Sequence, residues 1–335
     1  MKHTVYIVTG AAGHLGSAVV KRLTEQKKEV RALILPGERC EGGGTLLSEY
    51  TGDVCDPASL DRVFEGENTD FIMIHCAGII TIQAKKDARV HRVNVEGTKN
   101  VIDACMRNGA KRMVYVSSVH AIPEKPKGEI MPETYDFDPE SVTGCYAKTK
   151  AAATRLVLDA ASNGLDAVVV HPAGIIGPNG LLKGNIVHLI VNFLSGKLPA
   201  AVKGGFDFVD VRDVAAGVVS AADRGKTGEC YILSNRYIEL SEFFDTLSRV
   251  SGRKRLKWYM PMWFTRMIAP FAELFYRISG KTPLFTLYSL HTLSQNASYT
   301  HEKATRELGY KTRPLSESLY DTVMWLKKKG LVAEH

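Results

Sequence analysis

Short runs of apolar, mostly β-branched residues alternate with longer stretches of helical periodicity through the first half of this 335-residue chain. Continuous apolar strands are typical of a parallel sheet buried on both faces, because each crossover connection lays a helix over the sheet. The pattern therefore predicts a doubly wound α/β domain. The expected strands are Val5–Thr9, Val30–Leu35, Phe71–Cys76, Met113–Ser117 and Ala167–His171, and the expected helices are Ser17–Gln26, Val93–Arg107 and Tyr146–Asn163.

The rhythm changes after His171, where glycine and proline cluster between residues 174 and 184. A helical pattern follows at 185–194, residues 206–214 predict a strand that leads into a helix, and 230–233 predicts one more short strand. The rest of the chain is mainly helical and rich in aromatic residues. The second half therefore predicts a smaller, mainly helical lobe beside the α/β domain.

Composition narrows the class of protein. With 45% hydrophobic and 24% charged residues, the chain has the balance of a soluble globular protein, which excludes a disordered, collagen-like or small disulfide-stapled chain. Residues 250–335 carry 14 Lys or Arg and 6 Asp or Glu, so this stretch holds the whole of the net charge of +7. Such a surplus suits an acidic ligand, an anionic membrane surface or, most often, a solvated face. No helix-turn-helix or stacking-platform pattern accompanies it, so we expect no nucleic-acid partner.

Cysteine and histidine spacing and the apolar segments exclude further classes. Six cysteines are scattered without a C-x-x-C pair, and no histidines cluster at metal-ligand spacing, so we expect neither a disulfide framework nor a metal site. The N-terminus runs directly into an apolar strand, and we expect a cytoplasmic protein. The most apolar late segment, 258–278, contains Arg266, Glu273 and Arg277. We therefore expect no transmembrane segment, and peripheral contact with a membrane stays open.

A glycine-rich turn, Gly10-Ala11-Ala12-Gly13-His14-Leu15-Gly16, joins the first strand to the first helix. Gly10 would permit a tight turn, Gly13 would let the backbone approach a pyrophosphate, and Gly16 would let the helix pack closely on the strand. In this strand-to-helix context the motif is typical of dinucleotide binding. We therefore expect residues 1–175 to form a dinucleotide-binding domain to which 204–235 returns, and residues 176–203 with 236–335 to form the substrate-binding lobe.

The end of the second strand normally distinguishes the two dinucleotides, because an acid there binds ribose hydroxyls and an arginine binds a 2′-phosphate. The strand tip here lacks an acid, and the following Glu38 and Arg39 could be ligands or solvated loop residues. We favour NADP over NAD, with Arg39 on the phosphate. Asp53 and Val54 could lie at the edge of the adenine ring, whereas Asp56 is expected to cap the next helix.

Tyr146 and Lys150 lie four residues apart in a segment of high helix propensity, so their side chains share one helical face. A tyrosine with its ordinary pKa of about 10 exchanges protons poorly at neutral pH until a nearby ammonium stabilises the phenolate. An isolated Y-x-x-x-K match is usually a solvated helix face. Here, however, Ser117-Ser118 ends a predicted strand, and parallel sheets gather their ligands at the carboxyl ends of strands.

These residues together resemble an extended short-chain dehydrogenase/reductase of the NAD-dependent epimerase/dehydratase superfamily, with a Rossmann-type doubly wound sheet. Leu308-Gly309-Tyr310 and a terminal helix containing Trp325 are similar to its dihydroflavonol-4-reductase-like and 3β-hydroxysteroid-dehydrogenase-like branch. The matching segments, which occur in family order, are Thr9–Gly16, Gly52–Val54, His75–Gly78, Asn94–Thr98, Val116–Ser118, Tyr146 with Lys150, His171–Pro178 and Phe208–Val214.

The resemblance implies a role for each residue and a homodimer. Tyr146 would be the general acid in carbonyl reduction and the base in alcohol oxidation, and Lys150 would lower its pKa and hold the nicotinamide ribose. Ser118, or alternatively Ser117, would hydrogen-bond the carbonyl oxygen, and Asn94 would satisfy backbone groups. The implied cofactor contacts are Gly10, Ala12, Gly13, His14, Leu15, Gly16, Arg39, Asp53, Val54, Cys76, Ala77, Gly78, Ser117, Tyr146, Lys150, His171, Ala173, Gly174 and Ile175.

The aromatic residues between 258 and 293 admit three interpretations. Aromatics at helical spacing are most often core, which is our expectation. They could instead wall an apolar pocket over the nicotinamide, or touch a membrane together with the flanking basic residues. Further substrate contacts are expected, by position alone, at His120, Asn185, His188 and Phe206. The aromatic set is Trp258, Tyr259, Trp263, Phe264, Phe271, Phe275, Tyr276, Phe285 and Tyr288, and the basic set is Arg253, Lys254, Arg255 and Lys257.

The sequence thus predicts an NAD(P)-dependent oxidoreductase that interconverts a secondary alcohol and a ketone or aldehyde on a fairly hydrophobic small molecule. The alternative is a nucleotide-sugar epimerase or dehydratase with tightly held NAD. His171 disfavours it, because sugar-nucleotide members often carry an arginine there, and so does the aromatic lobe. A third hypothesis, a non-catalytic dinucleotide sensor, leaves the proton relay without a purpose. The strand-two tip also lacks the arginine typical of flavonoid reductases.

Overall fold

A seven-stranded parallel sheet forms the centre of the computed structural model, which describes residues 3–40, 44–81, 86–180, 184–269 and 287–333. The strand order is β10-β6-β5-β4-β1-β2-β3, so the chain direction across the sheet reverses between β1 and β4. This confirms the predicted doubly wound α/β class. The strands are β1 (His3–Thr9), β2 (Glu29–Ile34), β3 (Leu47–Thr51), β4 (Thr69–His75), β5 (Arg112–Val116), β6 (Ala167–Pro172) and β10 (Cys230–Leu233).

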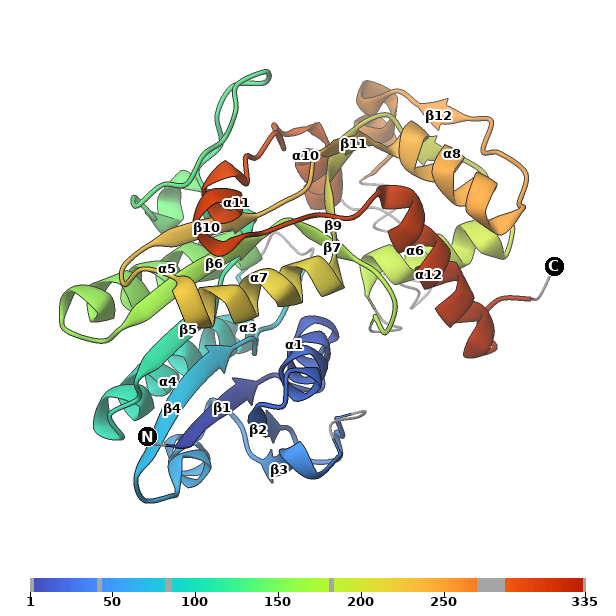
Figure 1. Ribbon diagram of the computed structural model, residues 1–335. Helices are drawn as coiled ribbons and strands as arrows, with labels where there is room; N and C mark the ends of the chain where they lie inside the picture. The colour runs from blue at the N-terminus through green and yellow to red at the C-terminus, as the bar shows by residue number, and fades with distance from the viewer. Residues whose placement is uncertain (1–2, 41–43, 82–85, 181–183, 270–286, 334–335) are drawn as a thin grey trace.

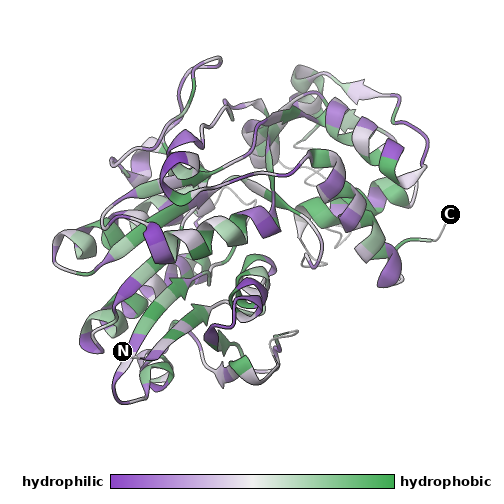
Figure 2. Ribbon diagram, viewed as in Figure 1, coloured by the Kyte–Doolittle hydropathy of each residue, from purple (hydrophilic) through white to green (hydrophobic). Residues whose placement is uncertain are grey.

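Helices cover the sheet, because its apolar strands need shielding on both faces. Helix α1 (His14–Glu25) packs against α7 (Val211–Arg224), and α4 (Gly97–Arg107) packs against both α2 (Pro57–Asp61) and α5 (Cys145–Ser162) (Figure 1). The short α3 (Ala88–His91) runs into a π-helical turn at Arg92–Glu96. Figure 2 shows how strongly apolar the central strands are.

A second, smaller group of elements follows. A three-stranded sheet of order β11-β9-β7 carries the helices α8, α10 and α12, and a β12–β8 pair lies beside it. Helix α6 packs on α8 through Phe193 and Phe244, while α11 packs on α7 and β10. Of residues 204–235, α7 and β10 therefore lie with the large sheet and β9 with the small one. The bounds are β7 (Gly174–Ile176), α6 (Asn185–Leu194), β8 (Ala201–Val202), β9 (Gly205–Asp210), β11 (Tyr237–Glu239), α8 (Leu240–Ser251), β12 (Tyr259–Met260), α10 (Leu287–Ser294), α11 (Glu302–Leu308) and α12 (Leu315–Lys328).

The aromatic segment does not follow the expectation of a core. Trp258, Trp263 and Phe264 are exposed, so the core interpretation is wrong for these three side chains. In the helical segment 262–269 the small residues Thr265 and Ala269 are buried instead, and Trp263, Phe264 and Met267 are exposed. The expected core positions Phe271, Phe275, Tyr276 and Phe285 lie outside the described residues. Within the described ranges, no helix is long and apolar enough to cross a membrane.

Candidate active site

The glycine loop lies where the sheet reverses direction, between the carboxyl ends of β1 and β4. Gly10 has a φ of +63°, and a Cβ there would lie 2.7 Å from Ala77, which follows β4. A Cβ at Gly16 would collide with the Gly10 carbonyl, so only glycine lets α1 start this close to the strand. Gly13 caps α1 without a side chain, and the first-turn amides have no intrahelical acceptor. The loop thus offers a bare helix N-terminus to an anion.

Residues after β4 fix the other side of this crevice. The Thr9 hydroxyl lies 2.6 Å from His75 Nδ1 and accepts the Ala77 amide at 3.3 Å. In the π-helical turn, Asn94 Oδ1 accepts from the Ile79 amide at 2.7 Å, and its Nδ2 donates to the Ile79 carbonyl at 3.0 Å. These contacts hold the Cys76–Gly78 backbone in place. Asn94 thus satisfies backbone groups, the role expected for it.

The loop after β2 gives the two candidate nucleotide ligands different surroundings. Glu38 is held within its own turn, because its carboxylate accepts the Leu35 amide at 3.2 Å. Arg39 follows that turn and is exposed. Asp53 Oδ1 accepts the Cys55 amide at 2.9 Å, and Asp56 caps α2 through the Ala58 amide, as expected.

Tyr146 and Lys150 lie one turn apart on α5, and both are buried. Lys150 Nζ donates to the Val116 carbonyl at 2.8 Å and to the Tyr115 hydroxyl at 3.3 Å, so the helix is tied to the end of β5. Burial lowers the pKa of Lys150 from 10.5 to about 8. Burial also raises the pKa of Tyr146 to about 12, and the neighbouring Ser118 opposes this rise. The expected lowering of the Tyr146 pKa by Lys150 is therefore not found in this structure, where that pKa lies above its ordinary value of 10.

The structure separates the adjacent serines, which sequence left open. Ser117 Oγ lies 2.6 Å from the Thr154 hydroxyl, which itself donates to the Lys150 carbonyl. Ser117 is thus occupied with the backbone side of α5, whereas Ser118 faces Tyr146. The alternation of side chains along an extended backbone produces this division.

His171 ends β6 directly beneath the serine. Its ring Nδ1 donates to the Ser118 carbonyl at 3.0 Å, which fixes the tautomer because a carbonyl oxygen only accepts. The ring stacks on Phe137 at 5.2 Å, and its Nε2 finds no hydrogen-bond partner in the described part of the chain. Burial lowers the His171 pKa to about 4, so the ring is neutral. Downstream, Gly174 lies so close to Phe206 that a Cβ would approach its ring to 2.9 Å.

Two of the four expected substrate contacts meet beside Tyr146. The His120 ring stacks on Phe206 at 5.3 Å and meets the Tyr146 ring edge-on at 6.1 Å. Burial lowers the His120 pKa to about 4, so this wall is uncharged. His188 is not brought to this cluster; it is exposed on α6, 3.4 Å from Asn192. Asn185 begins α6, and its side chain is outside the described part of the structure.

Tyr288 is a neighbour of the site that spacing could not assign. Its ring lies against Gly144, the residue before α5, where a side chain would collide with it. Gly144 has a φ of +101°, which also favours glycine. The tyrosine belongs to the aromatic series of the sequence, but only the fold brings α10 to the start of α5. Tyr288 contributes to the raised pKa of Tyr146.

Comparison with known proteins agrees with this arrangement. Residues 6–234 match the NAD dependent epimerase/dehydratase family. The chain belongs to this family. It is 32% identical over 332 residues to a putative dihydroflavonol 4-reductase of Synechocystis sp., covering 98% of this chain and 96% of that one. It is 29% identical over 331 residues to sterol demethylase protein B of Methylococcus capsulatus, covering 97% and 99% of the two chains.

Solved structures show the same architecture. The crystal structure of gox2253 superposes with a TM-score of 0.85 at 30% identity, covering 98% of this chain and 99% of that chain. A UDP-glucose 4-epimerase from Thermotoga maritima superposes with a TM-score of 0.77 at 20% identity, covering 97% and 99%, which shows the fold alone. The resemblance to extended short-chain dehydrogenases is thereby confirmed. The chain is an NAD(P)-dependent oxidoreductase of this family, and its named relatives include reductases and dehydrogenases.

Proposed function

We propose that the protein interconverts a secondary alcohol and a ketone or aldehyde on a fairly hydrophobic substrate. The observation that carries this proposal is the buried face of α5, where Tyr146 lies one helical turn from Lys150 and beside Ser118. In carbonyl reduction, Tyr146 would donate its phenolic proton to the substrate oxygen while Ser118 hydrogen-bonds that oxygen. In alcohol oxidation the same proton returns to Tyr146. The bound nicotinamide would supply or accept the hydride.

Lys150 supports this relay through its charge. Its ammonium is held by the Val116 carbonyl and has a lowered pKa of about 8, yet it remains mostly protonated at neutral pH. An ammonium in a site of low polarity stabilises a nearby phenolate more strongly than it would in water. We propose that Lys150 also binds the nicotinamide ribose.

The crevice fits a dinucleotide, because side chains at Gly10 or Gly16 would fill the space that the loop needs and the α1 amides are available to a pyrophosphate. We propose NADP as the preferred form. Arg39 is exposed and available to a 2′-phosphate, whereas one carboxylate oxygen of Glu38 is already bonded within its own turn. The other proposed contacts are those named from the family motifs.

The surroundings of Tyr146 favour an apolar substrate. The stacked His120 and Phe206 rings and the nearby Tyr288 present aromatic, uncharged surface. Such surface suits a fused-ring or long-chain carbonyl compound better than a diphosphate sugar, for which a fixed positive charge would be needed. Relatives named after a dihydroflavonol and a sterol are consistent with this class. We propose that residues 176–203 and 236–335 supply the substrate lobe, and that the enzyme works as a cytoplasmic homodimer.

Cofactor turnover tests the proposal. Purified protein with NADP⁺ or NAD⁺ and a panel of hydrophobic secondary alcohols should produce reduced nicotinamide, detected by its absorbance. Nucleotide sugars serve as the comparison, since an epimerase would convert them without net change in the cofactor. Epimerised sugar without net cofactor reduction on any alcohol would replace the proposed reaction with the alternative one.

A further inference from the structure

An exposed apolar surface lies on the second group of elements. Trp258 is 74% exposed, Trp263 69% and Met267 56%, and the Phe264 ring lies 5.7 Å from that of Trp263. In Figure 1 the chain from the end of α8 through β12 to segment 262–269 runs along the outer edge of this group. We call residues 253–267 the outer surface. Single exposed apolar side chains are ordinary, whereas neighbouring large ones at such exposure mark an interaction site.

Segment 262–269 leaves several of its large side chains outside the core. On its inner face Ala269 packs with Val202 and Leu290, Met262 packs against the same cluster, and the buried Thr265 donates to the Pro261 carbonyl at 3.1 Å. Trp263 and Met267, four residues apart, share the outer face. Folding alone favours a tryptophan inside the molecule. The exposed Trp263 and Met267 therefore leave apolar surface available to a partner.

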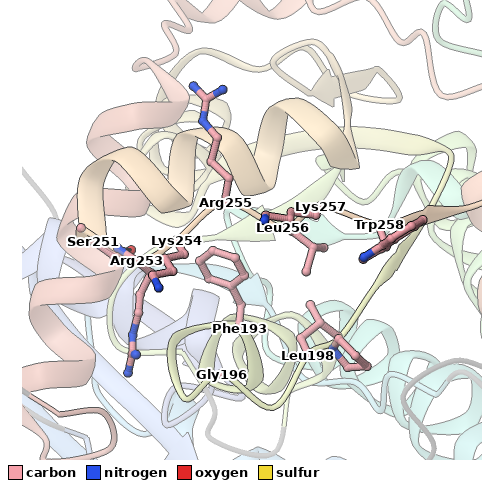
Figure 3. A pocket seen from close by; sticks show the side chains of 12 residues that line it. Phe193, Gly196, Leu198, Ser251, Arg253, Lys254, Arg255, Leu256, Lys257 and Trp258 are labelled. Carbon is pink, nitrogen blue, oxygen red and sulfur yellow. Dashed lines mark hydrogen bonds between the residues drawn. The ribbon is translucent and has the colours of Figure 1, made fainter.

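Positive charge adjoins these aromatics. The segment between α8 and β12 carries Arg253, Lys254, Arg255 and Lys257, and only Arg255 has an acidic partner in the described ranges, Asp245 at 3.8 Å. Together with the end of α6, this segment borders a groove of about 670 Å³ whose apolar lining includes Phe193, Leu198 and Leu256. Figure 3 shows these apolar side chains between the basic segment and α6, with Trp258 at one end. None of the proposed catalytic residues lines the groove.

The outer surface is connected to the proposed active site through one helix. Arg266 Nη2 donates to the Ser294 hydroxyl at 2.7 Å, at the end of α10. The other end of α10 carries Tyr288, whose ring lies against Gly144 beside Tyr146.

From these observations we infer that the outer surface docks on an anionic phospholipid membrane. Trp258 and Trp263 enter the boundary between headgroups and acyl chains, and Lys254 and Lys257 lie against the phosphates. The charge favours this occupant over a second copy of the chain, because a twofold contact would bring identical positive segments together. Docking itself is independent of the reaction, whereas delivery of an apolar substrate from the membrane rests on the proposed function.

Vesicle co-sedimentation of the full-length protein tests the docking. Vesicles of phosphatidylcholine mixed with phosphatidylserine should bind the protein, and pure phosphatidylcholine vesicles should bind it much less. The double variants Trp263→Ser/Phe264→Ser and Lys254→Glu/Lys257→Glu should each weaken binding by about tenfold or more. Matched controls are Met106→Ser/Met324→Ser, exposed apolar positions on α4 and α12, and Arg22→Glu/Lys27→Glu, exposed basic positions at α1. Both controls should bind as the native protein does.

Tryptophan fluorescence locates the contact. In a Trp325→Phe background, Trp258 and Trp263 are the remaining tryptophans, and brominated lipids should quench their emission. Equal binding to both vesicle types, or unchanged binding by the two outer-surface variants, would overturn the inference. A third contradicting outcome is a native protein that binds no vesicles but forms a dimer in light scattering, which the Trp263→Ser/Phe264→Ser change dissociates. Turnover of a water-soluble alcohol should be the same in that variant, so loss of docking and failure of the proposed chemistry are distinguishable.

Discussion

Helix α5 and segment 262–269 distribute their side chains in opposite ways. On α5 the polar Tyr146 and Lys150 are buried, at the expense of strongly shifted pKa values. On segment 262–269 the apolar Trp263 and Met267 are exposed while Thr265 is buried. Burying Lys150 lowers the stability of the folded chain, whereas the exposed Trp263 and Met267 only forgo the stabilisation that burial would give, and function is the usual reason for either arrangement. The two regions differ in their proposed ligands: the buried face of α5 would bind a cofactor and substrate, and segment 262–269 would bind a membrane surface.

The largest effect is expected at Tyr146. Tyr146→Phe removes the proton donor but keeps the ring that packs beside His120, so turnover should fall by about 100- to 10,000-fold with the fold intact. Steady-state kinetics measures the loss, and circular dichroism with cofactor binding provides the control. Unaltered turnover would show that this hydroxyl takes no part in proton transfer.

Lys150→Met should change activity and stability in opposite directions. Because burial lowers the Lys150 pKa from 10.5 to about 8, the native state binds fewer protons than the unfolded state between these values. Native stability should therefore rise through that pH range, and the variant should lack this rise. At neutral pH the variant should lose activity yet be more stable, by up to about 3 kcal/mol. Urea unfolding from pH 7 to 11 checks this, and identical pH dependence in both proteins would contradict it.

Arg39→Ala should have a smaller, selective effect. Losing one charge-assisted contact should weaken NADPH binding by about tenfold and leave NADH binding unchanged. Fluorescence titration with both reduced cofactors measures the two affinities. Equal changes for the two would make Arg39 a spectator and leave NAD as the better assignment.

The smallest effect belongs to the exposed face. Trp263→Ala should change the free energy of unfolding by less than about 0.5 kcal/mol, because the side chain is largely solvated. Phe243→Ala, which empties a fully buried position on α8, should cost about 3 to 5 kcal/mol. Parallel urea titrations measure both. A large loss at Trp263 would mean that this side chain serves the fold itself.

Local sequence patterns were enough to predict most of the α/β domain. The apolar runs, the glycine turn and the Tyr146–Lys150 spacing each depend on residues that are close in sequence. The sheet and the shared helical face could therefore be predicted. The edge strand β3 was missed because it is short, mostly polar and partly exposed. The choice between Ser117 and Ser118 needed the direction of each side chain at the end of β5.

Long-range contacts were beyond sequence patterns. Tyr288 reaches the start of α5 only because α10 folds back across the molecule. Helical spacing of aromatic residues indicates an apolar helix face but does not show whether that face is packed against the protein or exposed. This is why Trp258, Trp263 and Phe264 were expected in the core. His188 was placed near the substrate by its position in the chain, and the orientation of α6 leaves it exposed.

A structure of the protein with NADP⁺ bound tests the central claim most directly. The pyrophosphate should lie at the Gly10–Gly16 loop and the nicotinamide ring within reach of the Tyr146 hydroxyl, with Lys150 on the adjoining ribose. A nicotinamide ring that lies away from Tyr146, or a protein that binds neither NADP⁺ nor NAD⁺, would contradict it.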